Sequence, residues 1–548
     1  MQLFKSVTPI SSTRLTLLVS AYFTLVLNLR IGITYAASNE INSILGLVQA
    51  FAFMLFVFCI VFILFSLFNF RRLNKLTLII ALLSSVPALY FSLQFNTLFD
   101  ESMLNNALET DAKEAADLLS SAYWIMLIFL ALIPSAIIYK YPVNYPNIYR
   151  SCLKNGLSIL IAVVLLIGAI APFYAKFSSF VRNNNTVLKN SLLPYAPLHA
   201  LYRTLQLRYF HSGEVVKQLD LNAKRKVLAP SQFEQHKPLA LIVIVGETAR
   251  ESSFTPLLKR LSNTEGYLKP SHNLIYFNNF WSCGTNTAAS LPCMFSTFGK
   301  DQYKRSYNRE YENVAETINR VGYQVTWRNN NSGCKGLCKE LHKDPINVSN
   351  SAQFSSFGHF YDEALVVDLD QRIASSSQDQ VIFLHQLGSH GPAYFKRVPK
   401  KYKLEQPACE SQDFSKCTQQ EIVNAYNNTI LYTNHVIASA ISKLEKLSAQ
   451  YDTALVYLSD HGESTGEGGY YLHGIPYFMA PDEQIHIPML FWISDGFAAQ
   501  KGIDLNCLQN KSADKLSHDN FSHLLLGLLD IETHFYQKNE DITESCRR

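Results

Sequence analysis

The chain has 548 residues, of which 48% are hydrophobic and only 17% are charged. Ordinary soluble proteins carry about 25% charged residues, and disordered chains are poor in apolar ones, so this composition excludes a disordered or acidic-tail protein. The net charge of +4 is small for this length and no Lys/Arg cluster stands out, which leaves no case for a nucleic-acid partner.

The first third of the chain contains long stretches without charge. A helix needs about 20 apolar residues to cross a bilayer. Four uncharged stretches reach that length, and a fifth is broken only by Arg30, whose long side chain can reach the membrane interface. A cleaved signal peptide is the alternative for the first span, but we find no small-residue cleavage site before Ala36. The predicted spans are Leu15–Asn39, Ile41–Phe70, Leu76–Phe99, Leu118–Tyr139 and Asn155–Ala175.

Charges between these spans predict the orientation of a membrane domain over residues 1–176. The segments before the first span, after the second and after the fourth are basic, whereas the loop after the third is acidic. Because basic loops stay in the cytoplasm, we expect the N-terminus inside and, after an odd number of spans, everything beyond Ala175 outside. The basic residues are Lys5, Arg14, Arg71, Arg72, Lys75, Lys140, Arg150 and Lys154.

Eight of the ten cysteines fall in the predicted outer part. An even number of cysteines in an oxidising compartment indicates disulfides. Short spacings suggest the pairs Cys283–Cys293, Cys334–Cys338 and Cys409–Cys417, which leaves Cys507 with Cys546. The alternative for Cys334 and Cys338 is a zinc site, but no second Cys or His pair completes a structural tetrad.

The outer half has two parts. Residues 177–238 form a bridging segment, in which Pro197–His211 suits either a helix lying on the membrane surface or an ordinary core helix. Over residues 239–548, apolar runs alternate with helical patterns, which predicts an α/β domain with a mostly parallel central sheet. The predicted strands are Leu239–Val245, Gln380–Leu384 and Thr453–Leu458, and the predicted helices are Glu310–Val321 and Glu421–Leu447.

Polar residues follow each of the three predicted strands. Glu247 follows the first strand, the pair Asp460–His461 follows the last, and His390 comes shortly after the middle one. Ligands of such sheets lie beyond the carboxyl ends of the strands, and carboxylates with imidazoles form a divalent metal site for which Zn²⁺ is the default. Each residue alone could instead be a helix cap or a structural histidine.

A threonine-rich segment, Trp281–Cys293, supplies a fourth element. Small and hydroxyl residues around Thr285 precede a short helical stretch. A threonine at a helix N-terminus is usually only a cap. It could instead be a nucleophile, because a metal lowers the pKa of a bound hydroxyl and a helix N-terminus stabilises the phosphate that the hydroxyl acquires.

Taken together, four motifs make the chain resemble the lipid A phosphoethanolamine transferases, the family that includes the transferable colistin-resistance enzymes. The motifs are GETAR at 246–250, CGTNTAASLPC at 283–293, GSHGP at 388–392 and SDHGES at 459–464. The resemblance runs from the five spans to the C-terminus. It implies an outer domain with the alkaline phosphatase and sulfatase fold.

The resemblance also implies roles for individual residues. The zinc ligands would be Glu247, Thr285, Asp460 and His461, with Thr285 also the nucleophile. His390 and His473 would assist, either at a second zinc or by handling the leaving-group proton. Asn331, Ser332 and Lys335 would contact the phosphate and ethanolamine, and Asn106, Thr110 and Glu114 would be the lipid-proximal polar residues.

The activity so implied is transfer of phosphoethanolamine from phosphatidylethanolamine to a lipid A phosphate through a covalent threonine ester. We expect a monomer in the bacterial inner membrane with its catalytic domain in the periplasm, and resistance to polymyxin as the result of a lower surface charge. A core sugar or periplasmic glucan is the alternative acceptor. A sulfatase would need a C-x-P-x-R pattern, which is missing, and a glycerophosphate polymerase fits the eight outer cysteines less well. A binding protein with a dead site would have lost a zinc ligand, and all four candidates are present.

Overall fold

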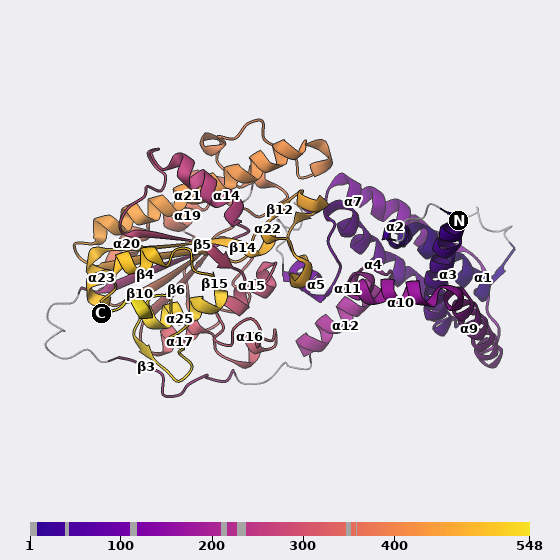
Figure 1. Ribbon diagram of the computed structural model, residues 1–548. Coiled ribbons are helices and arrows are strands. Elements are labelled where there is room, and N and C mark those ends of the chain that lie inside the picture. The colour runs from indigo at the N-terminus through magenta and orange to yellow at the C-terminus, as the bar shows by residue number, and fades with distance from the viewer. Residues whose placement is uncertain are drawn as a thin grey trace. The chain divides into compact units, whose positions relative to one another are not determined.

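The computed structural model describes residues 8–38, 43–109, 118–209, 216–226, 237–346, 352–357 and 359–548. The chain divides into a helical unit and a unit built on a large sheet (Figure 1). The helical unit comprises Met1–Leu104 and Leu119–Gln206, and the sheet unit comprises Asn105–Leu118 and Leu207–Arg548.

Among the described residues, four helical segments of the first unit are long and apolar enough to cross a membrane: Ile44–Leu67 (α3), Asn74–Phe95 (α4), Ser121–Lys140 (α7 to α8) and Ile148–Phe173 (α9 and one further turn). A bent pair, Ser12–Leu27 and Leu29–Ala37, makes a fifth span if it is counted as one, with an angle of 51° between its halves. These segments confirm the predicted helical membrane region, with the first span broken.

The break in the first span is at Asn28, which is buried. Its side-chain amide donates to the carbonyl of Leu193 at 2.8 Å, and its side-chain oxygen accepts from the amide of Leu193 at 2.8 Å. A polar side chain at this depth needs such partners, because lipid offers none. The sequence pattern shows an apolar run here and does not reveal the bend.

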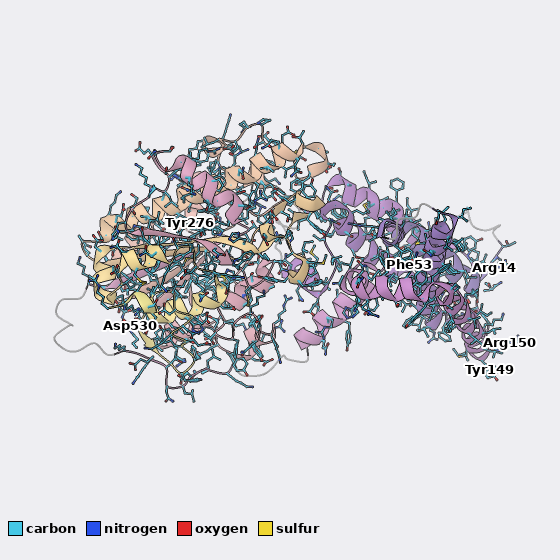
Figure 2. All side chains as sticks on the ribbon, in the orientation of Figure 1. Arg14, Phe53, Tyr149, Arg150, Tyr276 and Asp530 are labelled. Atoms are coloured by element: carbon cyan, nitrogen blue, oxygen red, sulfur yellow. A yellow bond between two sulfur atoms is a disulfide. The ribbon has the colours of Figure 1, made fainter. Side chains whose placement is uncertain are left out.

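Three basic segments lie at one end of the helical unit. Strand β1 (Ile10–Ser11) pairs with β2 (Val143–Asn144), which brings the N-terminal segment to the connection between the fourth and fifth spans. Lys75 donates to the carbonyls of Tyr139 and Tyr141, at 2.9 and 2.7 Å. Arg14 and Arg150 are seen at this end in Figure 2. The basic loops that the sequence assigns to one membrane face therefore do share a face.

The sheet unit is built on eight strands in the order β15-β5-β14-β11-β4-β10-β6-β7. The four consecutive strands β11, β4, β10 and β6 run parallel to one another, whereas β14 is antiparallel to both β11 and β5. The sheet is thus mostly parallel, as predicted. The bounds are β4 Leu239–Gly246, β5 Leu274–Trp281, β6 Gln324–Asn329, β7 His342–Lys343, β10 Gln380–His385, β11 Asp452–Ser459, β14 His486–Ile493 and β15 Leu516–Ser517.

Helices cover both faces of this sheet (Figure 1). Helices α14 (Glu251–Leu261) and α21 (Gln419–Leu447) lie on one face, and α17 (Val314–Arg320) and α25 (His518–Leu528) lie on the other. Strands β4, β10 and β11 are buried along their whole length, which explains the apolar run that each contains.

Two helix boundaries differ from the prediction for a local reason. The predicted helix Glu310–Val321 is shorter in the structure. Glu310 ends the separate helix α16 (Tyr307–Glu310), and α17 begins only at Val314, because Asn313 caps it in a capping box that Glu316 completes. Helix α21 begins at Gln419, ahead of the predicted start, because Thr418 forms a capping box with Glu421.

All eight outer cysteines are paired, as Cys283–Cys293, Cys334–Cys338, Cys409–Cys417 and Cys507–Cys546. These are the four pairs that the spacing predicts. The two remaining cysteines, Cys59 and Cys152, are free.

Candidate active site

Two neighbouring parallel strands bring three ionisable side chains together. Glu247 directly follows β4, and Asp460 and His461 directly follow β11. Ser459 lies opposite Gly246 in the strand register, so the residues after each strand emerge side by side. The carboxyl edge of the sheet is where a ligand site is expected in an α/β fold.

These three side chains form a buried cluster, called here the carboxylate–histidine cluster. His461 Nε2 lies 3.3 Å from a Glu247 oxygen and 3.4 Å from Asp460 Oδ2. His461 Nδ1 lies 2.9 Å from the carbonyl oxygen of Gly462, which can only accept, so Nδ1 holds the hydrogen. In the neutral ring, the Nε2 lone pair therefore faces two carboxylates.

Such an arrangement is costly without a cation. Asp460 Oδ2 is buried and, among the described residues, has no hydrogen-bond partner. Burial and the negative charge of Glu247 raise the pKa of Asp460 to about 7. Burial lowers the pKa of His461 but the two carboxylates raise it more, to about 9. Two carboxylate oxygens and one imidazole nitrogen within 4.8 Å of one another could hold a metal ion, and this donor set fits zinc.

A threonine hydroxyl completes the cluster, and it belongs to Thr287. Its Oγ1 lies 3.1 and 3.2 Å from the two Glu247 oxygens and 3.4 Å from His461 Nε2. Thr287 is the first residue of α15 (Thr287–Met294), and the preceding Asn286 caps this helix by accepting from the amide of Ala289. The hydroxyl thus lies at a helix N-terminus, where the backbone amides favour an anion.

The predicted nucleophile, Thr285, is placed differently. It is also buried, and its carbonyl accepts from the amide of Gly474 at 2.8 Å. In the described part of the chain its hydroxyl makes no hydrogen bond to the carboxylate–histidine cluster. The geometry therefore favours Thr287 over Thr285 as the fourth donor. The signal that was missed is Asn286: asparagine is a strong cap, so the helix begins at the residue after it.

The two assisting histidines lie close by. The ring centroids of His473 and His461 are 4.5 Å apart, and those of His473 and His390 are 5.2 Å apart. His473 Nδ1 lies 2.7 Å from a carboxylate oxygen of Glu463, whose other oxygen accepts from the hydroxyl of Tyr394. Burial lowers the pKa of His473, so the ring is neutral at pH 7 and can accept a proton. Sequence reasoning missed Glu463, although it lies within the SDHGES motif.

The three predicted phosphate- and ethanolamine-side residues form a chain of hydrogen bonds that reaches the cluster. Asn331 Nδ2 donates to a Glu247 oxygen at 2.8 Å, and the hydroxyl of Ser332 donates to the Asn331 side-chain oxygen at 3.2 Å. Lys335 Nζ donates to that hydroxyl at 3.1 Å. Of the predicted lipid-proximal residues, Asn106 lies in α5 (Glu101–Glu109), while Thr110 and Glu114 lie outside the described residues.

One further histidine joins the two halves of the site. His518 Nδ1 accepts from the backbone amide of Cys283 at 3.0 Å, and its Nε2 donates to the carbonyl of Ser459 at 3.0 Å. It thereby ties the loop before α15 to the end of β11. Burial lowers the pKa of His518 to about 3, so the ring is neutral at physiological pH.

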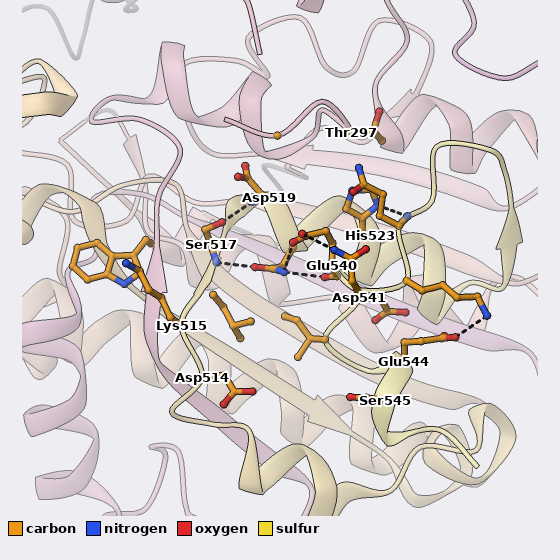
Figure 3. A pocket seen from close by; sticks show the side chains of 18 of the residues that line it. Thr297, Asp514, Lys515, Ser517, Asp519, His523, Glu540, Asp541, Glu544 and Ser545 are labelled. Carbon is orange, nitrogen blue, oxygen red and sulfur yellow. Dashed lines mark hydrogen bonds and ion pairs between the residues drawn. The ribbon is translucent and has the colours of Figure 1, made fainter. Parts of the chain in front are cut away.

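The sheet unit also contains a cavity of about 1010 Å³ that lies away from the carboxylate–histidine cluster. Figure 3 shows Asp519, Glu540 and Asp541 gathered around it. No member of the carboxylate–histidine cluster lines it, and its charged lining is six acidic residues against three lysines. This excess of carboxylates disfavours a phosphate ligand. The acids are Asp301, Asp514, Asp519, Glu540, Asp541 and Glu544, and the lysines are Lys511, Lys515 and Lys538.

The fold and the site together define a protein with a helical membrane region and a sulfatase-like C-terminal domain. Residues 240–531 match the sulfatase family, and residues 57–209 match the family described as phosphoethanolamine transferase EptA/EptB. The chain is 33% identical over 545 residues to phosphoethanolamine transferase EptA of Escherichia coli K12, covering 97% of this chain and 96% of that protein. It is 33% identical over 522 residues to phosphatidylethanolamine transferase Mcr-1 of Escherichia coli, covering 94% of each.

Among solved structures, the integral membrane lipooligosaccharide phosphoethanolamine transferase A (EptA) from Neisseria meningitidis matches with a TM-score of 0.91 and 31% identity, covering 99% of this chain and 100% of that one. The chain belongs to the phosphoethanolamine transferase family.

Proposed function

We propose that this protein transfers phosphoethanolamine from phosphatidylethanolamine to a phosphate of lipid A, through an ester on Thr287. The observation that carries the proposal is the Thr287 hydroxyl, which lies within 3.4 Å of both Glu247 and His461 at the start of a helix. Membership of the phosphoethanolamine transferase family supports the group that is transferred. A buried hydroxyl among metal-ligand side chains supports a nucleophile.

Glu247, Asp460, His461 and the Thr287 hydroxyl would hold a zinc ion. When bound, zinc lowers the pKa of a coordinated hydroxyl and stabilises charge on phosphoryl oxygens. The buried, unpaired Asp460 oxygen is the feature that such an ion would satisfy.

The reaction has two displacements. Thr287 Oγ attacks the donor phosphorus, the bond to the diacylglycerol oxygen breaks, and His473 takes the threonine proton and returns it to the departing oxygen. Glu463 stabilises the charged ring in between. An oxygen of the acceptor phosphate then attacks the same phosphorus, and the bond to Thr287 Oγ breaks.

The helical unit fits a donor and an acceptor that are both lipids. Anchoring the catalytic unit at the bilayer raises the effective concentration of both substrates. We place the end of the helical unit with Arg14, Lys75 and Arg150 in the cytoplasm and the catalytic unit in the periplasm, following the charge rule. The product carries an added amine, so cationic peptides such as polymyxin lose part of the charge that attracts them.

The direct test is mass spectrometry of lipid A from a bacterium that lacks its own phosphoethanolamine transferases and expresses this chain. We expect lipid A with added phosphoethanolamine, and none with a Thr287→Ala variant of equal abundance in the membrane. If lipid A is unmodified and a core sugar or periplasmic glucan carries phosphoethanolamine instead, lipid A is not the acceptor, while the proposed reaction with the donor still holds.

A further inference from the structure

A small basic cavity lies against the helix that holds Thr287. Its volume is about 40 Å³, and Ala288 and Pro292, one turn apart on α15, form one wall. Ala288 directly follows Thr287 in the chain. Since a water molecule needs about 10–15 Å³ of such space, the cavity admits a group of a few heavy atoms, which is the size of a phosphoryl group.

The charged residues that line this cavity are all basic, and none of them belongs to α15. Arg305, Arg309 and Lys335 line it, together with the uncharged Asn308 and Ser306, and no described residue of the lining is acidic. All three cations are half-buried. An arginine guanidinium offers parallel donors that match two oxygens of a phosphate. The cavity is therefore the electrostatic opposite of the large acidic one in Figure 3.

The walls of the basic cavity are held in place covalently. The Cys283–Cys293 disulfide brackets the α15 wall, and the Cys334–Cys338 disulfide closes a five-residue loop around Lys335. Lys335 has a φ of +48°, a conformation that non-glycine residues rarely adopt. Asn308 donates to the carbonyl of Lys335 at 2.8 Å, which ties the arginine segment to this loop. A site fixed before its ligand arrives loses less entropy on binding.

The cavity is also linked to the active site by hydrogen bonds. Lys335 reaches the carboxylate–histidine cluster through Ser332 and Asn331, with successive hydrogen bonds of 3.1, 3.2 and 2.8 Å. These bonds link one wall of the cavity to the cluster, and Ala288 in another wall directly follows Thr287 in the chain.

We propose that Arg305 and Arg309 bind the phosphate monoester of the acceptor and hold one of its oxygens toward the phosphorus on Thr287. This inference rests on the proposed function. An acceptor phosphate must approach a phosphoryl group that is already anionic, and like charges at such distances repel strongly unless cations lie beside them. A phosphate monoester carries about −1.5 to −2 charges at neutral pH, whereas the donor diester carries one, so the arginine pair favours the acceptor over the donor.

The bonds balance in the second displacement. A lone pair on the acceptor oxygen forms the new bond to phosphorus as the bond from phosphorus to Thr287 Oγ breaks. An acceptor phosphate that carries one proton gives it to His473 as its oxygen attacks, and the charged His473 ring then gives that proton to Thr287 Oγ. The product is a diphosphate link that bears the ethanolamine, and Thr287 is free for the next donor.

The experiment separates the two displacements in the purified full-length protein, in detergent micelles with phosphatidylethanolamine and lipid A. Diacylglycerol release and the mass of the Thr287 ester report the donor step, and modified lipid A reports the acceptor step. Arg305→Ala and Arg309→Ala should each raise the KM for lipid A by about 10- to 100-fold, the loss expected for one hydrogen bond to a charged group. The ester should form as in the wild type.

The matched control is Lys304→Ala, which removes a positive charge from an exposed neighbour that does not line the cavity and should leave both steps unchanged. Arg305→Lys serves in case the Arg305→Ala variant folds poorly. It keeps the positive charge, so it should recover part of the affinity for lipid A. Ester formation that falls in parallel in both arginine variants would assign the cavity to the donor and overturn the proposal. An unchanged KM for lipid A would overturn it as well.

Measuring lipid A binding to a protein that cannot form the ester tests the role of the basic cavity separately from the proposed function. In a Thr287→Ala background, lipid A in micelles should bind about tenfold more weakly when Arg305 is also replaced by Ala. Lipid A stripped of its phosphates should bind both proteins equally weakly. If the wild type forms no ester, the proposed function fails, while this binding comparison still decides the role of the cavity.

Discussion

The choice between two neighbouring threonines is the most informative test of the site. Thr287 and Thr285 are both almost fully buried, with 4% and 5% of their surface exposed, so replacing either by alanine costs the fold a similar amount, about 1 kcal/mol. Of these two threonines, only Thr287 makes a hydrogen bond to the carboxylate–histidine cluster in the part of the chain that the structure describes. Stability should therefore not distinguish the two variants, whereas activity should.

The expected effect on activity is large. Thr287→Ala removes the atom that forms the ester, and loss of a covalent nucleophile lowers turnover by at least about 10³-fold, or about 4 kcal/mol of barrier. Thr285→Ala should keep most of the transfer, and Thr287→Ser should keep part of it because a hydroxyl remains.

The assay is mass spectrometry of the purified protein after incubation with phosphatidylethanolamine alone, together with a thermal unfolding curve for each variant. Wild type and Thr285→Ala should gain one phosphoethanolamine group on the α15 peptide, and Thr287→Ala should gain none. The assignment of Thr287 as the nucleophile would be refuted if a folded Thr287→Ala variant still acquired the group or if the ester mapped to Thr285. An ester on Thr285 would confirm the residue predicted from the sequence motif.

Three further outcomes are expected. Asp460→Asn should lose bound zinc and transfer together, measured by metal analysis beside activity, while Thr285→Ala keeps both; full zinc in the Asp460 variant would remove that residue from the ligand set. Burial lowers the pKa of His518 to about 3, below the value of 6.5 for an exposed ring, so this residue's contribution to stability is complete above pH 6.5 and is lost as the pH falls toward 3, by up to about 5 kcal/mol. His518→Gln keeps one donor and one acceptor, and urea unfolding at pH 7 and pH 5 should show a smaller pH dependence for it than for the wild type. Replacing Cys283 and Cys293 together by serine should cost about 3 kcal/mol and raise sensitivity to protease around α15, and no change in either would deny the bridge a structural role.

The membrane region and the sheet could be predicted because both depend on long, uniform patterns. Uncharged runs identify spans, and the fully buried strands β4, β10 and β11 each contain an uninterrupted apolar run. The bend at Asn28 was not predictable in this way, because its cause is a pair of hydrogen bonds to Leu193, far away in the chain.

In the site, the residues that directly follow strands were found because topology alone brings them together. Glu247 and Asp460 are neighbours as soon as β4 and β11 pair in register. Thr287 was missed because a motif gives the segment but not which of its two threonines faces the cluster; that depends on where α15 begins. The tertiary contacts of His518 and the place of Arg305 in the basic cavity could not be predicted, because no local sequence pattern indicates either.

The position of β5 in the sheet has a consequence for how the protein is made. This strand leads directly into the Thr287 loop, yet its partners in the sheet are β14 and β15, which come from the last part of the chain. Pairing of such distant segments is slow and occurs only once both are present. If the catalytic unit is exported as proposed, the chain presents Glu247 first but cannot fix Thr287 beside it until the C-terminal strands have also crossed. On the proposed mechanism, an unfinished chain held at the membrane therefore has no assembled nucleophile with which to attack the surrounding lipids.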